Sequence, residues 1–474
     1  MDALALALGQ ALPWLLGVAL LLALDWPRPA PATGVEGAAG RLALRLGYGY
    51  FIGALLLTFW MRALSSAGLG FSRMSIGGPL LAATIALLVF AARRRRPTLA
   101  GARVAALEML RPPLPRWEQL AWALLFAWLA VRFALLACEI AWRPLYPWEA
   151  WVQWATKARV WYEHARIVPF VPADVWLAGG TDGYFDAAPD APATVPLLQV
   201  WGCVALGAWD DSAMNWPWLL MAIALSLAVY GALRDAGIKR LSALLGGYFV
   251  ASLPLLDTHV ALAGCADLML SGVYALAALA LHRWAACRDR FDAAAALLLA
   301  LACPLIKPSG VLWMLTLLPG AVVVLIPERG LKLVGKSFAV AALLLLAVAQ
   351  TDTTIAGYRV HLDYQPQWAS QLDAYLLLGN WHLLFYGAVL LAIIGARRLL
   401  RPPLAPLAVV VASGLALLLI ASAFSWASAA LADFTTFNRA TLHLAPLLVC
   451  LMLLLWRELA QRAPAPAALV VADA

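Results

Sequence analysis

The chain has little charge for its length. Asp, Glu, Lys and Arg make up 13% of its 474 residues, whereas they make up about 25% of an ordinary soluble domain. Hydrophobic residues make up 64%, and the mean hydropathy is +0.83. Apolar runs near the roughly 20 residues that cross a bilayer recur along the whole sequence. This composition excludes a soluble fold and predicts an all-α membrane protein without a separate soluble domain.

Cysteine is also scarce. The six cysteines form no Cys-x-x-Cys pair and show no metal-ligand spacing. Four of them, Cys138, Cys203, Cys287 and Cys450, lie in or beside apolar runs. We therefore interpret the cysteines as small apolar packing residues.

Thirteen segments are predicted to be membrane helices. They cover residues 3–24, 43–64, 77–92, 118–138, 213–233, 241–256, 265–284, 292–306, 309–326, 338–351, 376–396, 404–424 and 438–457. Four arginines at 93–96 place the end of the third helix in the cytoplasm by the positive-inside rule. The N-terminus and residues 139–212 are then external, and the C-terminus is cytoplasmic.

The distribution of basic residues supports this topology. It places 24 of the 34 Lys and Arg residues on the cytoplasmic side and 9 outside, with Arg132 inside a helix. The net charge of +8 is therefore that of a basic cytoplasmic face, and no nucleic-acid partner is expected. Membrane lipid is the expected surrounding partner.

The apolar segment 191–207 is predicted not to cross the membrane. It has about 17 residues and two prolines, which is short for a span. A crossing here would also move five later basic clusters to the outside. We expect an interfacial or re-entrant helix beneath the long external loop.

Two parts of the chain differ in polar content. Residues 1–116 carry little polar chemistry and are predicted to form an accessory bundle of three helices with a basic linker. Residues 117–474, with the external loop 139–212, carry the candidate site residues.

The stretch YPWEAWVQWATKARVW at 146–161 is the most unusual part of this loop. On a helix, Glu149, Gln153 and Lys157 stack along one face, and the tryptophans occupy other faces. Tryptophan favours the headgroup level of a bilayer. The stretch therefore predicts an amphipathic helix on the outer surface with Glu149 near the membrane. A belt helix whose polar stripe only faces water is the alternative.

Five other polar residues are predicted at the same outer level. They are Asp190, Asp267, Lys307, Arg439 and His443. Each alone is explained by a structural role, as a helix cap, a snorkelling end, a headgroup anchor or an interior histidine. A charge within the hydrocarbon costs roughly 2.5–3.5 kcal/mol on insertion scales, so their coincidence at one depth indicates a site. A carboxylate with several cations at a lipid boundary suits group transfer from a membrane-embedded phosphate to a hydroxyl.

The order of these motifs resembles that of bacterial polytopic membrane glycosyltransferases of the C-type (GT-C) fold. Relatives of that family are the protein O-mannosyltransferases and the lipid A aminoarabinose transferases. The similarity covers roughly residues 140 to 450. Its motifs are WEAWVQWATKA from 148, PDAPATVPL from 189, ADL from 266, KPSG from 307 and RATLHLAP from 439.

The resemblance implies a polyprenyl-phosphate sugar donor, a base in the first large external loop and helices lying along the membrane. It also implies a bacterial cytoplasmic (inner) membrane, with the active site facing the periplasm or exterior. Glu149 takes the position of the base, Lys307 and Arg439 those of donor-phosphate ligands, and Asp190 and Asp267 structural or sugar-contacting positions. Lys157 is a third candidate phosphate ligand, and His443 a further candidate substrate ligand.

The chain departs from the family pattern at three places. It has Glu149 where relatives usually carry Asp, Ala191 where they carry an aromatic residue, and Pro308-Ser309 where they carry Asn-Glu. A glutamate still serves as a base with a longer reach. The sugar contacts that follow Lys307 differ from those of the relatives.

The sequence thus predicts a glycosyltransferase that moves a sugar from a polyprenyl phosphate to the hydroxyl of a glycolipid, polysaccharide or protein. A polysaccharide polymerase or ligase, using Arg439 and His443, is one alternative. A transporter or flippase of lipid-linked sugars is another, but it predicts charges at the bilayer midplane, where only Arg132 lies. No carboxylate pair stands beside Glu149, and Asp210-Asp211 is interpreted as a helix cap. No cofactor is predicted; a divalent metal and the oligomeric state are left open.

Reporter fusions at residues 237 and 260 check the topology. We expect a cytoplasmic signal at 237 and an external signal at 260, because only this parity keeps the basic clusters inside. An external signal at 237 would contradict both the topology and the outer location of the predicted site.

Overall fold

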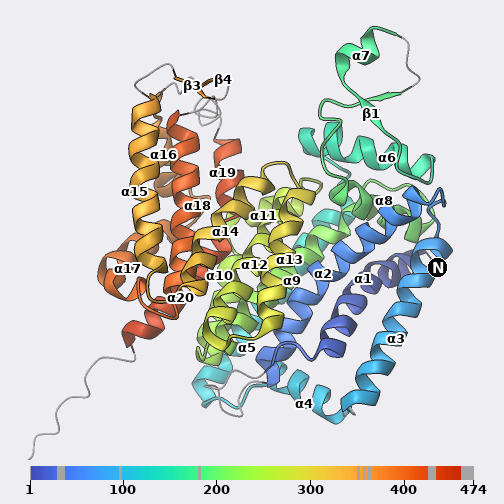
Figure 1. The fold of residues 1–474 in the computed structure, drawn as a ribbon. Helices are drawn as coiled ribbons and strands as arrows, with labels where there is room; N and C mark the ends of the chain where they lie inside the picture. The colour runs from blue at the N-terminus through green and yellow to red at the C-terminus, as the bar shows by residue number, and fades with distance from the viewer. Residues whose placement is uncertain are drawn as a thin grey trace, which may run out of the picture.

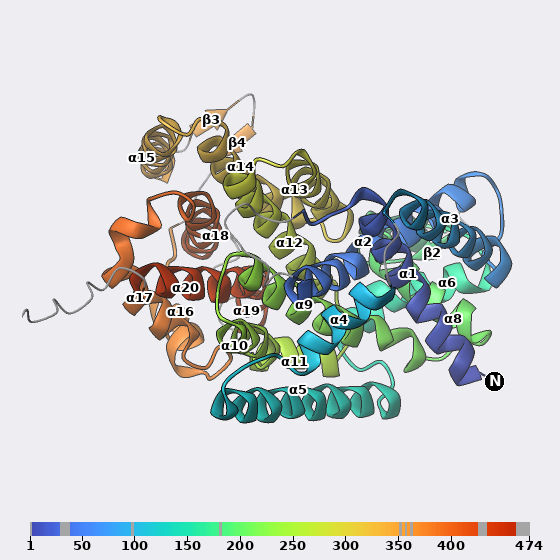
Figure 2. The same cartoon turned by 90° about the horizontal axis from the view of Figure 1, so that it is seen from below.

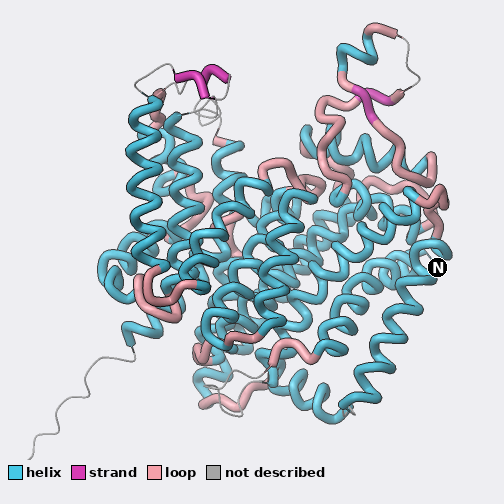
Figure 3. The backbone as a smooth tube through the Cα atoms, viewed as in Figure 1, coloured by secondary structure: helices cyan, strands magenta, loops and turns pink. Residues whose placement is uncertain are grey.

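The computed structural model describes residues 2–28, 38–95, 99–179, 183–349, 353–355, 358–360, 364–424 and 434–460. These residues are almost entirely helical (Figures 1 and 3). Arg96 of the arginine block, Arg462 and the last two residues of the predicted helix 338–351 lie outside them.

The first half of the chain comprises an N-terminal group of helices and the 139–212 loop. The N-terminal elements are α1 (Asp2–Leu24), α2 (Ala38–Ser66), η2 (Arg73–Gly77), α3 (Gly78–Arg95), α4 (Leu99–Leu110) and α5 (Arg116–Trp142). The loop contains η3 (Ala150–Ala155), α6 (Thr156–Glu163), β1 (Phe170–Val171), α7 (Ala173–Leu177), β2 (Tyr184–Phe185) and α8 (Thr194–Leu206). Strands β1 and β2 pair in parallel, with Phe170 opposite Tyr184.

The second half forms the centre and the C-terminal side of the molecule. Its central elements are η4 (Ala213–Asn215), α9 (Trp216–Asp235), α10 (Arg240–Ala251), α11 (Pro254–Ala261), α12 (Asp267–Cys287), α13 (Arg290–Ala302), η5 (Cys303–Leu305) and α14 (Gly310–Leu325). The remaining elements are α15 (Gly330–Ala349), β3 (Thr353–Ile355), β4 (Tyr358–Val360), α16 (Trp368–Leu372), η6 (Asp373–Leu377), α17 (Leu384–Leu399), α18 (Ala405–Phe424), α19 (Thr435–Leu442) and α20 (Ala445–Ala460). Strands β3 and β4 pair antiparallel.

The chain is a multi-pass membrane protein, but the predicted count of thirteen spans is not supported. Among the described residues, 8 helices are long and apolar enough to cross a membrane, or up to 10 if each of two bent pairs counts as one span. The bent pairs are α10 with α11, at 59°, and α19 with α20, at 49°. Three predicted spans became the shorter helices α13, α14 and α17, of 13, 16 and 16 residues. At 1.5 Å per residue these reach only about 20–24 Å, less than the roughly 30 Å hydrocarbon core.

The two ends of the bundle differ in chemistry. The end that carries α6, α7 and β1, here called the loop end, lies opposite the end that carries α4, here called the basic end (Figure 1). At the basic end Arg283 pairs with Asp235 and Asp292, and Arg398 donates a hydrogen bond to the Glu458 carbonyl. The ends of α9, α12, α13, α17 and α20 are therefore joined there by basic side chains.

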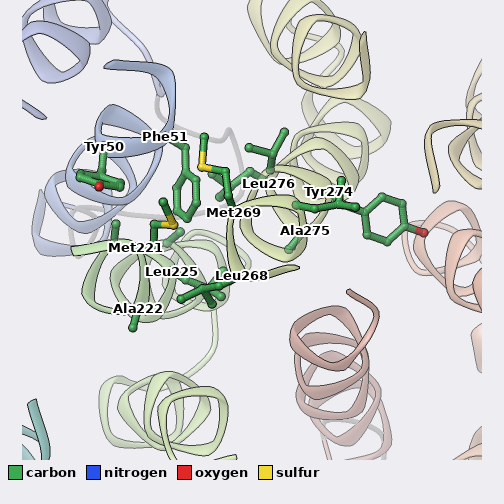
Figure 4. Close-up of a cluster of buried hydrophobic side chains, with 14 of the residues drawn as sticks. Tyr50, Phe51, Met221, Ala222, Leu225, Leu268, Met269, Tyr274, Ala275 and Leu276 are labelled. Carbon is green, nitrogen blue, oxygen red and sulfur yellow. The ribbon is translucent and has the colours of Figure 1, made fainter. Parts of the chain in front are cut away.

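Helix α12 forms the core of the bundle. It lies in the middle of the helices in Figure 2, whereas α3, α5 and α15 lie at the periphery. Most residues of α12 are buried, and its Leu268 and Met269 lie near Phe51 of α2 and Met221 of α9 (Figure 4). A helix that is apolar all round is expected at the centre of a membrane bundle.

Glycines allow the N-terminal helices to pack closely. A Cβ at Gly17 of α1 would lie 1.8 Å from the Gly49 carbonyl oxygen of α2, and one at Gly231 of α9 would lie 2.6 Å from the Leu44 nitrogen. Small residues permit such backbone approach in membranes, where dispersion contacts drive association. The N-terminal helices thus pack directly against α9.

Segment 191–207 forms α8, a buried helix of 13 residues that is too short to span. It packs against α1, α2 and α6, and Trp201 donates a hydrogen bond to the Gly9 carbonyl at 2.9 Å. Arg73 donates to the Val204 and Leu206 carbonyls, so a cation satisfies the exposed C-terminal end of the helix.

Candidate functional site

Four segments that are distant in the sequence meet at the loop end. They contribute Glu149 from the start of η3, Asp267 from the first turn of α12, Lys307 from the turn before α14, and Arg439 and His443 from α19 and its end. These five residues are here called the charged cluster, and all of them are among the seven predicted site residues. The remaining two, Lys157 and Asp190, lie elsewhere in the loop.

Asp267 is the anion on which the cluster is built. Its side chain is fully buried, and its Oδ1 accepts a hydrogen bond from Lys307 Nζ at 2.8 Å. Its Oδ2 accepts from two nitrogens of Arg439, Nε at 3.0 Å and Nη2 at 2.5 Å. Bonds between charged groups are about twice as strong as neutral ones, so this carboxylate offsets its own burial with two cations.

Arg439 connects the two carboxylates of the cluster. While Nε and Nη2 bind Asp267, Nη1 donates to Glu149 Oε2. The guanidinium group is planar and rigid, so its N–H groups hold both carboxylates in one plane. Arg439 therefore joins α19 to the external loop across 290 positions of sequence.

Glu149 lies where the backbone becomes π-helical. Residues 150–155 form the π-helix η3, in which residues five apart share a face. Trp154 Nε1 accordingly donates to Glu149 Oε1 at 3.3 Å. The predicted stack of Glu149, Gln153 and Lys157 assumed ordinary α-helical spacing, and the π turn separates Glu149 from Lys157.

The pKa of Glu149 is lowered. Burial alone would raise it, but the bond from Arg439 and the positive charges of Arg439 and Lys307 together outweigh burial. Glu149 is thus held as a carboxylate while Arg439 is bound to it.

His443 lies beneath the cations. Its Nε2 is 3.3 Å from Asp267 Oδ1, but the two are not aligned as a hydrogen bond, and its Nδ1 has no partner among the described residues. The ring packs edge-on against Trp313, with centroids 5.1 Å apart. His443 therefore stands between an apolar wall and the buried carboxylate.

The cluster has a buried floor and an accessible upper layer. Asp267 and His443 are 0% and 2% exposed, whereas the Glu149, Lys307 and Arg439 side chains are 30%, 22% and 21% exposed. A ligand that reaches the cluster would therefore meet one carboxylate and two cations.

Lys157 has a different partner. Its ammonium lies 3.3 Å from Asp186 Oδ1 and donates to the Ala188 carbonyl at 2.5 Å, and both charged side chains are buried. Asp190, which is exposed, adds a further negative charge near Lys157. This pair holds the external loop together, and the structure does not bring Lys157 or Asp190 into the charged cluster.

The tryptophans of the 146–161 stretch divide into two sets. Trp148 and Trp151 are 76% and 57% exposed, as expected of a headgroup belt, but Trp154 and Trp161 are buried in the protein. The exposed pair suits the headgroup level of a membrane, and the buried pair packs the loop onto the bundle.

Arg62 is a cation that the sequence interpretation missed. It lies in the last turns of α2, where its Nη2 donates to Thr194 Oγ1 at 2.8 Å, and Thr194 donates to the Leu305 carbonyl at 2.5 Å. No carboxylate of the described residues contacts Arg62. Leu305 precedes Lys307 by two residues, so this second cation lies beside the segment that carries Lys307.

An apolar groove leads to this point. It has a volume of about 370 Å³ and lies between α1, α2 and α13, from Trp26 and Phe291 near the basic end to Phe59 and Leu305 near the loop end. Arg62 lies over the Phe59 ring at 5.7 Å. The groove thus has a hydrocarbon-like wall and a cation at its loop end.

Metal ligation has no evident place in the cluster. Among the described residues, no group of three or more His, Cys, Asp or Glu side chains is arranged to hold a metal ion. The acids of the cluster are bound instead by Arg439 and Lys307.

Comparisons with family models, curated proteins and solved structures find no match for this chain.

Asp267 is expected to be the anchor of the cluster. Asp267→Asn leaves two cations without their buried anion and should lower the free energy of unfolding by about 3–5 kcal/mol. Glu149→Gln removes a partly exposed partner of Arg439 alone and should lower it by roughly 1 kcal/mol. Denaturant unfolding of both variants in detergent tests this difference, and equal losses would show that Asp267 is not the anchor.

Proposed function

We propose that the protein is a membrane glycosyltransferase that moves a sugar from a polyprenyl phosphate to an acceptor hydroxyl. One observation carries this proposal: a partly exposed carboxylate, Glu149, lies with Lys307 and Arg439 in one cluster at the loop end of the bundle. A base and phosphate-binding cations are the groups that the reaction requires.

The apolar groove supports a lipid-linked donor. Its walls from Phe291 to Leu305 suit a hydrocarbon tail, and its loop end lies beside Arg62 and two residues before Lys307. A donor in this groove would place its phosphate between these two cations. Lipid phosphates and cations pair by charge-assisted hydrogen bonds.

The charge balance of the cluster also favours an anionic ligand near Arg62. Glu149 and Asp267 are matched by Lys307 and Arg439, so the cluster is neutral without counting His443. A sugar phosphodiester brings one negative charge. Arg62, which contacts no described carboxylate, supplies the matching positive charge.

In the proposed reaction, Glu149 takes the proton from the acceptor hydroxyl. The hydroxyl oxygen then forms a bond to the anomeric carbon, while the bond from that carbon to the phosphate oxygen breaks. The electron pair stays on the lipid phosphate, which Lys307 and Arg62 stabilise. Attack opposite the leaving group inverts the configuration of the sugar.

The GT-C fold, the bacterial cytoplasmic membrane and an exterior-facing site belong to the same proposal. They rest on the order of the sequence motifs and on the positive-inside rule. The described contacts agree in one respect: residues from four of the five motifs, omitting PDAPATVPL, meet in the charged cluster.

A transporter of lipid-linked sugars is the second candidate function. The observation in its favour is the pair of bent spans, α10 with α11 and α19 with α20, which pack against each other. Broken helices in contact are typical of transporter binding sites. A transporter does not need a base, so the variant described next separates the two functions.

Glu149→Gln is expected to abolish most transfer while keeping donor binding. A general base contributes a rate factor on the order of 10² to 10⁴, and Gln is nearly isosteric but cannot take the proton. The measurement is sugar transfer from a synthetic polyprenyl-phosphate sugar to extracted envelope acceptors, alongside binding of the same donor. Transfer at the parent rate would exclude Glu149 as the base.

Lys307→Met and Arg62→Met should weaken donor binding. Each lost charge-assisted bond is worth roughly 1.5–3 kcal/mol, or about 10- to 150-fold in affinity. Arg159→Met is the matched control, because Arg159 is an exposed cation of the same loop that pairs with Glu163. Binding is measured with a polyprenyl-phosphate sugar in nanodiscs. Parent-like affinity in Lys307→Met and Arg62→Met would remove these residues from the phosphate site.

A further inference from the structure

A second cavity lies between α10, α17 and α20, apart from the proposed donor groove. It has a volume of about 580 Å³, which is within the usual size of small-ligand sites. Its lining is almost entirely apolar and includes Phe249, Trp381, Gly387 and Trp456. None of its lining residues also lines the groove between α1, α2 and α13.

The cavity has an apolar, exposed mouth. Phe249, Leu383 and Trp456 on its rim are 44%, 75% and 61% exposed. Phe249 and Trp456 lie in the two bent spans, and Leu383 directly precedes the apolar helix α17. The surrounding medium is therefore lipid, and the ligand that can enter without crossing water is a lipid chain.

The depth of the cavity fits one leaflet. On α20 it extends from Val449 to Trp456, seven residues or about 10 Å at 1.5 Å per residue. One leaflet of hydrocarbon is about 15 Å deep, half of the roughly 30 Å core. Trp456 directly precedes Arg457 on α20 and Leu391 lies six residues before Arg397 on α17, so the cavity lies on the basic side of the bundle. Ser252 and His382 form its upper edge.

Polar groups gather at this upper edge. His382 Nε2 lies 3.0 Å from the Ser252 carbonyl oxygen. Arg132 donates to the same carbonyl at 3.4 Å and to Asp257. Arg132 lies 16 residues into the 27-residue helix α5, within the membrane-spanning part of that helix. The cavity thus has an apolar interior that polar groups close at its upper edge.

We propose that this cavity binds one hydrocarbon chain of a lipid from the basic-side leaflet, with the lipid head at the basic end of α20, beside Arg457. An apolar chain fills the space between α10, α17 and α20, and its far end lies near Trp381. This inference does not depend on the proposed transfer reaction.

The bound chain would contact a residue that supports the charged cluster. Trp381 lines the cavity and is buried, and its Nε1 donates to Asn438 Oδ1 at 3.2 Å. Asn438 immediately precedes Arg439 on α19. The lipid site and the charged cluster therefore contact consecutive residues of the same short helix.

Photolabelling tests the proposal. The full-length protein is placed in vesicles that contain a phosphatidylcholine with a diazirine in one acyl chain, and the labelled peptides are mapped by mass spectrometry. We expect labels to concentrate on residues 384–391 and 449–456 relative to residues 333–344 of α15, which expose apolar side chains outside this cavity. Equal labelling of α15 and the cavity peptides would show ordinary boundary lipid and overturn the proposal.

Filling the cavity supplies the control. A Cβ at Gly387 would lie 2.7 Å from Met452 Cε, the end of a flexible side chain, whereas a Cβ at Gly335 on α15 meets nothing within 4 Å. Gly387→Leu should displace about two methylene groups and lower cavity labelling roughly tenfold, and Gly335→Leu should leave it unchanged. Leu391→Trp fills the same space if Gly387→Leu fails to fold. Unchanged labelling in a folded filling variant would refute the assignment.

Discussion

The buried carboxylate of Asp267 is the constraint on which the loop end depends. An ion removed from water costs several kcal/mol unless cations bind it, and Asp267 is completely buried at the start of the central helix. Its partners come from the turn before α14 and from α19, so these segments must meet at one level. The bend between α19 and α20 falls at His443 and Leu444, directly beside this contact. The geometry of the cluster therefore follows from neutralising one acid.

The cost of burying an unpaired charge also made much of the cluster predictable from the sequence. Asp267, Lys307 and Arg439 lie at the ends of apolar segments, and charges at one depth in a membrane protein must find each other. The position of Lys157 was not predictable by this argument, because the π turn at 150–155 changes which residues share a face. Its actual partner, Asp186, lies in a loop without regular periodicity. Arg62 was missed because its bond to Thr194, and the bond from Thr194 to Leu305, each join segments more than 100 residues apart.

The number of spans was overestimated for a related reason. Hydropathy finds apolar length but not where a helix stops. The breaks in the two bent spans each come just before a proline, Pro254 in α11 and Pro446 in α20. Proline disfavours helical geometry in the preceding residue and starts helices well, so these prolines were the available signal. The fold class was predictable from composition, whereas the broken spans required attention to single residues.

The shared arginine links donor binding to the base in the proposed reaction. Glu149 is a poor proton acceptor while Arg439 Nη1 is bound to it, because that bond helps to lower its pKa. A donor phosphate that approaches Lys307 competes for the same nitrogen, while Nε and Nη2 stay on Asp267. Loss of the Nη1 bond raises the pKa of Glu149 toward its ordinary value and makes it a stronger base. In the proposed reaction the base is therefore activated only when the sugar phosphate is in place.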